Sequence, residues 1–518
     1  MKQPIYLIML LFLLSCSSKR PFVNNPSDDG LIELVFLHVN DVYEIAPLPG
    51  DDLGGMARVA TLKKQLLSKN KNTLAILPGD FLNPSVIGTL KDANGNKIKG
   101  AHMVDVMNQA GIDIVTFGNH EFDLGLEDLQ MRLDESEFRW VSSNVLQNKE
   151  KGIKSFYKNK NDKRSKKEKI PETIIQTFTD EDGTSVTVGF FGVTLDVKQQ
   201  PYLTYKDPIQ RSKAMVEELD SKVDLIIPIT HLEIIEDKKL AKTIPRFPLI
   251  MGGHDHHHMR FLVGSTVVAK ADANAKTAYV HTIRYDTNDK TYTVYSELIT
   301  LDNNLNLDPN VNERVKYWTE IAEKDMEKQG FSPNEVVTVL DTPLDGKEST
   351  IRNRQCPLGT LVVESIANVC SNKIDAAILN SGSIRIDDIL SGNMTQYDII
   401  RILPYSGKIL EVEMTGLLLK KLLESSLKNK GEGAYLQLAG IEVDEGSLTF
   451  KIGGELLKTD KNYLIALNDF LLAGYDFKFF TKENKGIINI IEPKKEDSLK
   501  NDLRKAMIEY LKVKNNLN

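Results

Sequence analysis

The hexapeptide GNHEFD at residues 118–123 constrains the fold of this chain more than any other stretch. The apolar run Ile112–Phe117 before it predicts a buried strand, and Gly118 permits the tight turn that ends such a strand. An amide, an imidazole and two carboxylates then follow within five residues. Such a loop suits catalysis or metal binding, but one loop alone fits a polar turn around a core histidine equally well.

Four other predicted strands of the N-terminal half also end in polar residues. These apolar runs are Leu31–Val39, Thr73–Leu77, Val223–Ile229 and Pro248–Met251. Helices are expected between the strands, and this alternation predicts an α/β core. Ligands of such cores gather at the carboxyl ends of the strands. We therefore expect six side chains to meet there, namely Asp41, Asp80, Asn119, His231, His254 and His256.

These side chains form a mixed set of oxygen and nitrogen ligands. Such a set suits borderline to hard divalent ions, for example Zn²⁺, Mn²⁺, Co²⁺ or Fe²⁺. If one carboxylate bridges two ions, the pair activates water and holds a phosphoryl group for in-line displacement. Each segment alone is a weak signal, because a His-x-His loop is often plain polar surface.

The order of the polar segments adds a family resemblance. The segments NDVYE (40–44), GDFLNPS (79–85), GNHEFD, PITH (228–231) and GGHDH (252–256) resemble those of the calcineurin-like metallophosphoesterases, and most closely their 5′-nucleotidase branch. The resemblance extends from Leu31 to the end of the chain. It implies a two-domain α/β protein. A metallophosphoesterase β-sandwich flanked by helices would span residues 31–310, a connector helix 311–333, and a separate α/β substrate-binding domain 334–518.

The resemblance also implies a role for each polar residue. The first metal would bind Asp41, Asp80 and His256, and the second would bind Asp80, Asn119, His231 and His254. Asp80 would thus bridge the two ions, and a water activated by them would be the nucleophile. His120 would stabilise and protonate the leaving-group oxygen. Asp123 would orient that imidazole and keep it charged.

The first strand end departs from the family pattern. The family has Asp-x-His there with both residues on the metal, whereas this chain has Asp41-Val42-Tyr43. A phenol, with an ordinary pKa of about 10, is a poor neutral ligand, although a bound metal lowers that pKa. We predict a weaker or more selective first-metal site that favours a harder ion. Glu44 is a candidate replacement ligand.

The C-terminal half matches the same family in four segments. They are RNRQCPLGTL (352–361), NSGSIR (380–385), LPY (403–405) and DFLLAGYD (469–476). The resemblance assigns nucleotide binding to Arg352, Asn380, Arg385, Tyr405, Phe470 and Asp476. Two rings stack on a base, arginines bind carboxylate or phosphate, and an aspartate accepts from ribose hydroxyls. Tyr405 and Phe470 would be the stacking pair. Departures at Thr360, Ser381, Ser383 and Tyr475 leave the substrate open.

The expected reaction is hydrolysis of a phosphate ester, most simply a nucleoside 5′-monophosphate to nucleoside and phosphate. A UDP-sugar pyrophosphatase, a 2′,3′-cyclic nucleotide phosphodiesterase or a thiosulfate-ester hydrolase on the same scaffold is an alternative. A non-catalytic surface lipoprotein that binds nucleotide or a protein partner is another, and only Tyr43 supports it. The family implies domain rotation, for which Asn312–Gly330 is the candidate hinge region.

The N-terminus predicts export. A short apolar run, Ile5–Leu14, follows Lys2 and suits a signal peptide of residues 1–15 rather than a membrane span. Leu13-Leu14-Ser15-Cys16 resembles a bacterial lipobox, so Cys16 would carry a lipid and residues 16–30 would be a tether. A cleaved signal with an incidental cysteine is the alternative. Ser17 favours the outer membrane, so the protein would face the periplasm or cell surface.

The charge and the cysteine content limit which other partners the protein can have. The formal net charge of −7 argues against a nucleic-acid partner bound through bulk charge. Residues 149–169 hold ten lysines and arginines against three acids, which predicts a solvated surface insertion, with a lipid or nucleic-acid patch as the alternative. Pairing of Cys356 with Cys370 stays open, as does the oligomeric state.

Overall fold

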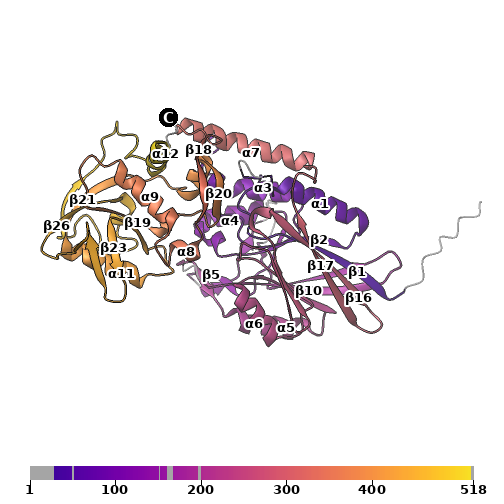
Figure 1. Ribbon diagram of the computed structural model, residues 1–518. Helices are drawn as coiled ribbons and strands as arrows, with labels where there is room; N and C mark the ends of the chain where they lie inside the picture. The colour runs from indigo at the N-terminus through magenta and orange to yellow at the C-terminus, as the bar shows by residue number, and fades with distance from the viewer. Residues whose placement is uncertain (1–28, 49–51, 151, 160–166, 197–199, 515–518) are drawn as a thin grey trace, which may run out of the picture.

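The structure is a computed structural model that describes residues 29–48, 52–150, 152–159, 167–196 and 200–514 (Figure 1). The expected signal peptide, Cys16 and most of the tether lie outside the described residues, as does part of the basic insertion. No helix within the described ranges is long and apolar enough to cross a membrane.

Two six-stranded sheets form the N-terminal half. The first runs in the order β17 (Thr291–Thr300), β16 (Thr277–Asp286), β1 (Leu31–His38), β2 (Thr73–Pro78), β3 (Ile114–Thr116) and β4 (Arg139–Trp140). The second runs in the order β14 (Met259–Val263), β15 (Thr266–Lys270), β13 (Leu249–Gly252), β12 (Leu225–His231), β10 (Ser185–Thr194) and β9 (Thr173–Thr179). One apolar cluster, which includes Phe36, Phe190 and Ile229, draws on both sheets, and the predicted β-sandwich is confirmed.

Helices cover both outer faces of the sandwich (Figure 1). One side carries α1 (Met56–Lys69), α2 (Val86–Thr89), α3 (Ala101–Ala110) and α4 (Leu126–Glu135), and the other carries α5 (Pro208–Leu219) and α6 (Ile234–Thr243). Strand β12 is therefore buried along its whole length, as expected for a strand covered on both faces. Two small sheets complete this half. One contains β5 (Val145–Lys149), β6 (Gly152–Lys154) and β11 (Leu203–Tyr205), and the other pairs β7 (Tyr157–Lys158), which contacts α4, with β8 (Glu168–Lys169).

Parallel pairing brings the polar strand ends together. In the first sheet β1 runs parallel to β2, and β2 parallel to β3, with Pro78 opposite Thr116. In the second sheet β12 runs parallel to β13, with Thr230 opposite Gly252. Parallel strands end at the same edge of their own sheet. The two sheets pack face to face, and the loops after their strands meet, as the contact of Asp80 with His231 shows.

The connector is a single helix, α7 (Pro309–Lys328). The Asp308 side chain caps its first turn by accepting from the N–H of Val311, and Gly330, with φ of 85°, follows its end. Both Arg314 and Trp318 donate to the Asp105 carboxylate of α3, over 2.9 and 2.7 Å. The expected hinge region therefore packs on the N-terminal half.

The C-terminal half has its own five-stranded sheet. Its strand order is β22 (Leu436–Ala439), β19 (Ala376–Asn380), β26 (Asn462–Asn468), β21 (Ile409–Thr415) and β27 (Ile487–Ile491). A second apolar core lies between this sheet and the helix α11 (Gly416–Lys428). The remaining elements are β18 (Val336–Asp345), α8 (Glu348–Ile351), α9 (Pro357–Asn368), β20 (Ile389–Thr395), α10 (Gln396–Ile402), β23 (Ile441–Asp444), β24 (Thr449–Ile452), β25 (Glu455–Leu456) and α12 (Leu503–Lys514).

The two described cysteines do not pair. Cys356 is the N-cap of α9, and Cys370 lies two residues beyond the end of that helix. Since twelve helical residues span about 18 Å, the two sulfur atoms are too far apart for a disulfide.

Candidate metal centre and active site

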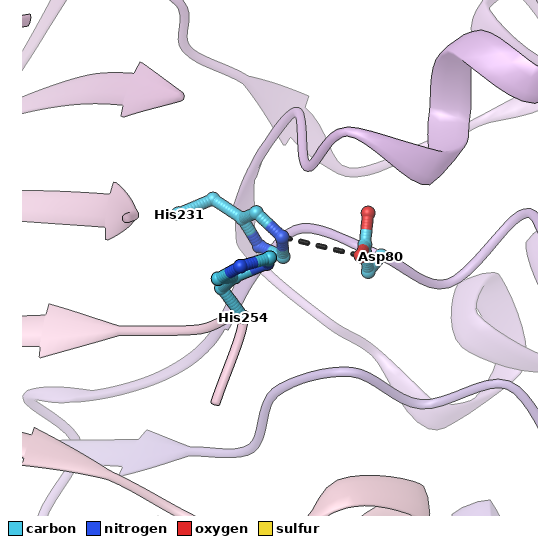
Figure 2. A group of neighbouring side chains, drawn as sticks. All are labelled: Asp80, His231 and His254. Carbon is cyan, nitrogen blue, oxygen red and sulfur yellow. Dashed lines mark ion pairs between the residues drawn. The ribbon is translucent and has the colours of Figure 1, made fainter. Parts of the chain in front are cut away.

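The six predicted ligands meet where the strands end. Figure 2 shows Asp80, which follows β2, beside His231 at the end of β12 and His254 in the loop after β13. One potential ligand atom from each of these three lies within 4.8 Å of the other two. His231 Nε2 is 3.2 Å from Asp80 Oδ2 and 3.1 Å from Asn119 Oδ1. This grouping is the second-metal set expected from the sequence.

The first-metal set adjoins it. His256 Nε2 lies 3.6 Å from Asp41 Oδ1, and the Asp41 Oδ2 atom accepts from the backbone N–H of His254 over 2.9 Å. Asp41, Asp80 and His254 all have positive φ angles, of 53°, 56° and 76°. Such backbone costs about 1–3 kcal/mol per residue. The fold thus accepts strain at three of the predicted ligands.

The carboxylate of Glu121 holds the two central loops together. It accepts four backbone N–H groups, from Asp80 at 2.9 Å, Phe81 at 2.8 Å, Leu82 at 3.0 Å and Gly118 at 2.6 Å. Sequence reasoning missed this role. The sequence shows only that a carboxylate lies inside the GNHEFD loop, and it does not indicate which backbone N–H groups that carboxylate binds.

The predicted acid pair is also in place. His120 Nδ1 is 2.8 Å from Asp123 Oδ2, which leaves Nε2 for a leaving group. Although burial lowers the pKa of His120, the carboxylates of Asp80 and Asp123 outweigh it and raise that pKa above its ordinary value. A protonated imidazole can donate to a leaving-group oxygen.

Tyr43 lies among the predicted first-metal ligands. Its hydroxyl oxygen is 3.1 Å from His256 Nε2, 3.2 Å from Asp80 Oδ2 and 3.4 Å from Asp41 Oδ1. Burial and the Asp80 and Asp41 carboxylates raise the pKa of Tyr43 well above its ordinary value, so the free site holds a phenol. Glu44, the candidate replacement ligand, instead accepts a 2.8 Å hydrogen bond from the Tyr397 hydroxyl of the C-terminal half.

The C-terminal half reaches this centre directly. Arg385 Nη2 donates to Asp123 Oδ2 over 2.8 Å, on the same oxygen that contacts His120. His256 Nδ1 lies 3.0 Å from the Asp387 carbonyl oxygen and 3.3 Å from its Oδ2. Such a partner on the far ring nitrogen directs Nε2 toward the ligand group. No sequence motif pointed to Asp387.

A buried lysine supports the histidine loop. Lys270 is fully buried, with its Nζ 2.6 Å from Asp255 Oδ2 and 3.0 Å from Asp237 Oδ2. Because Asp255 lies between His254 and His256, this network fixes the loop that carries both. Sequence reasoning did not single out Lys270. His258, two residues after His256, is exposed and pairs with Asp272.

The predicted substrate residues of the C-terminal half fall into two groups. Arg352 and Arg385 both pair with the Glu348 carboxylate. Asn380 accepts from Asn468 over 3.1 Å and interacts with Asp476. One oxygen each of Asn468 and Asp476 is buried and has no hydrogen-bond partner among the described residues. These two oxygens could accept from a bound ligand.

The two predicted stacking residues, Phe470 and Tyr405, have different surroundings. Phe470 stacks on Tyr475, with ring centroids 5.6 Å apart and an interplanar angle of 26°. Both rings are exposed, Tyr475 to 70%. Tyr405 instead lines an interdomain cleft of about 560 Å³ together with Asn83 and Asp123. The structure therefore adds Tyr475, noted in the sequence only as a departure, to the residues that could stack on a base.

Comparisons with known proteins match both halves. The family described as calcineurin-like phosphoesterase matches residues 34–258, and that described as 5′-nucleotidase, C-terminal domain, matches residues 336–482. The 5′-nucleotidase of Bos taurus is 26% identical over 88% of this chain and 85% of its own length. A trifunctional nucleotide phosphoesterase protein of Bacillus subtilis is 26% identical over 92% of this chain, which spans 35% of that protein.

Solved structures of similar fold cover almost the whole chain. A 5′-nucleotidase precursor from Thermus thermophilus has a TM-score of 0.66 at 20% identity, over 93% of this chain and 97% of that one. A sulfate thiohydrolase from the same organism has a TM-score of 0.60 at 14% identity, over 93% of this chain and 94% of that one. At these identities the likeness concerns the fold alone.

Proposed function

The chain belongs to the calcineurin-like phosphoesterases of the 5′-nucleotidase branch, and from this premise we propose that it hydrolyses nucleoside 5′-monophosphates to nucleoside and phosphate. As a family member it is a metal-dependent phosphoester hydrolase. The nucleoside monophosphate is our inference.

One contact carries the proposal. Arg385, predicted to bind substrate from the C-terminal half, shares the Asp123 oxygen with the catalytic His120 imidazole. The Arg385 guanidinium is nine-tenths buried and also lies 3.6 Å from Glu348. An arginine in this place suits an anionic group held beside the general acid.

The donor set suits two divalent ions. Neighbouring ligands of one ion, with bonds of about 2.1 Å, lie about 3.0–3.4 Å apart, and His231 meets Asp80 and Asn119 at 3.2 and 3.1 Å. Asp80, Asn119, His231 and His254 would hold one ion, and Asp41, Asp80 and His256 the other. When bound, such ions activate water and neutralise charge on the phosphoryl group.

The chain's own residues would then complete the reaction. His120 would pass the proton on its Nε2 atom to the departing oxygen of the ester, because its Nδ1 atom is occupied by Asp123. Phe470 and Tyr475 would offer an exposed aromatic face to the base. The oxygens of Asn468 and Asp476 that have no hydrogen-bond partner in the described part of the chain would accept from the ribose hydroxyls.

The test is phosphate release by the soluble fragment Ser17–Asn518. AMP, a UDP-sugar, a 2′,3′-cyclic nucleotide, a thiosulfate ester and p-nitrophenyl phosphate would each be assayed with Mn²⁺, Co²⁺, Zn²⁺ or Mg²⁺, and with EDTA. We expect metal-dependent release that favours AMP. Phe470→Ala should raise KM for AMP and leave KM for p-nitrophenyl phosphate unchanged.

Other outcomes would replace this substrate. Faster turnover of a UDP-sugar, a cyclic nucleotide or a thiosulfate ester would assign that alternative. Activity on p-nitrophenyl phosphate alone would retain the metal centre and reject the nucleotide. Nucleotide binding without turnover under any metal would favour a binding lipoprotein.

We further propose that the protein is exported and anchored in a bacterial envelope through a lipid on Cys16. The apolar run and the lipobox-like residues before Cys16 support this. Labelling of expressing cells with a fatty acid should mark the wild-type protein and spare a Cys16→Ser variant. Equal labelling of both would reject the anchor.

A further inference from the structure

The hydroxyl of Tyr43 faces the predicted first-metal ligands in a fixed orientation. The Tyr43 side chain is 8% exposed. Its ring makes edge contacts with the rings of His120 and His256, at centroid distances of 6.3 and 5.5 Å. Its backbone N–H donates to Asn274 Oδ1 over 3.0 Å. Packing and backbone therefore hold the phenol oxygen in place.

The hydroxyl of Tyr43 lies 3.1 Å from His256 Nε2, an ordinary hydrogen-bond distance, but its hydrogen bonds to the two carboxylates are long. A hydroxyl has one proton and can donate it to only one carboxylate. A hydroxyl donating to a carboxylate normally lies about 2.5–2.7 Å from it. The Tyr43 oxygen is 3.2 Å from Asp80 Oδ2 and 3.4 Å from Asp41 Oδ1. Both separations are too long for a strong hydrogen bond to a buried carboxylate.

The same separations suit ligands that share an ion. Atoms bound at about 2.1 Å to one metal lie about 3.0 Å apart at right angles and about 3.4 Å apart at tetrahedral angles. The Tyr43 oxygen lies between 3.1 and 3.4 Å from three predicted ligand atoms of the first metal. It thus has the spacing of a fourth ligand of that ion.

Neighbouring side chains that could replace it are engaged elsewhere. Glu44 accepts from Tyr397. Asn40 donates to Asp41 and accepts from the N–H of Ala271 over 2.6 Å. The side-chain carbonyl oxygen of Asn274 accepts from the backbone of Tyr43. Tyr43 is therefore the best-placed additional donor.

We propose that Tyr43 binds the first metal through its phenolate oxygen. Asp41, Asp80 and Tyr43 then supply three anionic oxygens and His256 one imidazole nitrogen, a set that favours a harder cation than a histidine-rich site does. On binding, the O–H bond of Tyr43 breaks and its proton passes to solvent, with no change in oxidation state. This inference rests on the metal centre of the proposed function, although its test does not use activity.

Optical spectroscopy with iron(III) tests the ligand. Full-length protein in detergent is stripped of metal and given iron(III). A bound phenolate transfers charge to iron(III) and produces a visible absorption band with tyrosinate vibrations in resonance Raman spectra. We expect both signals in the wild type and in Tyr202→Phe, a matched control because the Tyr202 hydroxyl donates to the Leu124 carbonyl over 2.7 Å. Both signals should vanish in Tyr43→Phe.

A second variant guards against a folding defect. Tyr43→His restores the family's Asp-x-His segment, so it should bind two ions by elemental analysis and show no phenolate band. A band that persists in Tyr43→Phe, or its absence from wild-type protein that holds iron(III), would overturn the proposal. If the band is present but no phosphate ester is hydrolysed, the proposed function fails while the Tyr43 ligand stands.

Discussion

Replacement of Glu121 by glutamine should destabilise the N-terminal half strongly, although the change alters one atom. Glu121 is fully buried. Its Oε1 atom accepts from the N–H groups of Phe81 and Leu82, and its Oε2 atom from those of Asp80 and Gly118. The glutamine side chain keeps one acceptor oxygen and has an NH₂ group, a donor, in place of the other. In either orientation two buried N–H groups lose their acceptor and face another donor.

The magnitude follows from this count. A buried donor without a partner costs about 1–3 kcal/mol, so two cost about 2–6 kcal/mol. That is a large part of the total free energy of unfolding of a typical folded domain, which is about 5–15 kcal/mol. Because one of the two lost donors can be the N–H of Asp80, the carboxylate predicted to bridge the two ions should also shift, which would weaken metal binding.

Urea unfolding of the metal-free protein measures the effect. Both tryptophans, Trp140 and Trp318, lie in the N-terminal half or in α7 packed on it, so their fluorescence reports that half. Burial raises the pKa of Glu121 to about 7, and the assay is therefore run at pH 8. Glu217→Gln, at an exposed position of α5, is the control and should change stability by less than about 0.5 kcal/mol. A loss below about 1 kcal/mol for Glu121→Gln, less than one unpaired donor costs, would refute the reasoning.

Three further predictions test other parts of the centre. His120→Asn should lower kcat by about 10²–10⁴-fold while elemental analysis still finds both ions; loss of metal would contradict an acid role. Asp387→Ala removes a carboxylate 3.3 Å from His256 Nδ1 and should weaken first-metal binding about tenfold in calorimetric titration, whereas unchanged affinity would exclude a positioning role. Lys270→Met leaves the buried Asp237 charge uncompensated and should cost about 3–5 kcal/mol in urea unfolding. Adding Asp237→Asn to that variant should recover part of the loss, and no recovery would mean the pair is not coupled.

Much of the architecture was predictable because local sequence carries it. Apolar runs of strand length, each followed by polar residues, predicted β1, β2, β3, β12 and β13 within about two residues of their observed ends. Parallel pairing aligned the strand ends within each sheet, as strand-end reasoning expects, and the packing of the two sheets brought Asp80 of one beside His231 of the other. The family resemblance added the roles of the ligands.

Contacts between distant parts of the chain were not predictable in this way. Arg385 reaches Asp123 across 262 positions, and Glu44 meets Tyr397 across 353. The sequence does not indicate either pair, because a charged or hydroxyl side chain can form hydrogen bonds with many groups that folding brings near it. The same holds for Lys270, which no motif distinguished from a surface lysine.

Tyr43 separates the two kinds of information most clearly. Sequence alone showed that this position departs from the family's histidine, since the surrounding motif specifies where a ligand belongs. Only the tertiary structure showed its hydroxyl at ligand spacing from Asp41, Asp80 and His256, with Glu44 turned to the C-terminal half. A local motif identifies the position of a ligand and the residue that occupies it. The distance between two side chains, by contrast, depends on how strands far apart in the chain pack together.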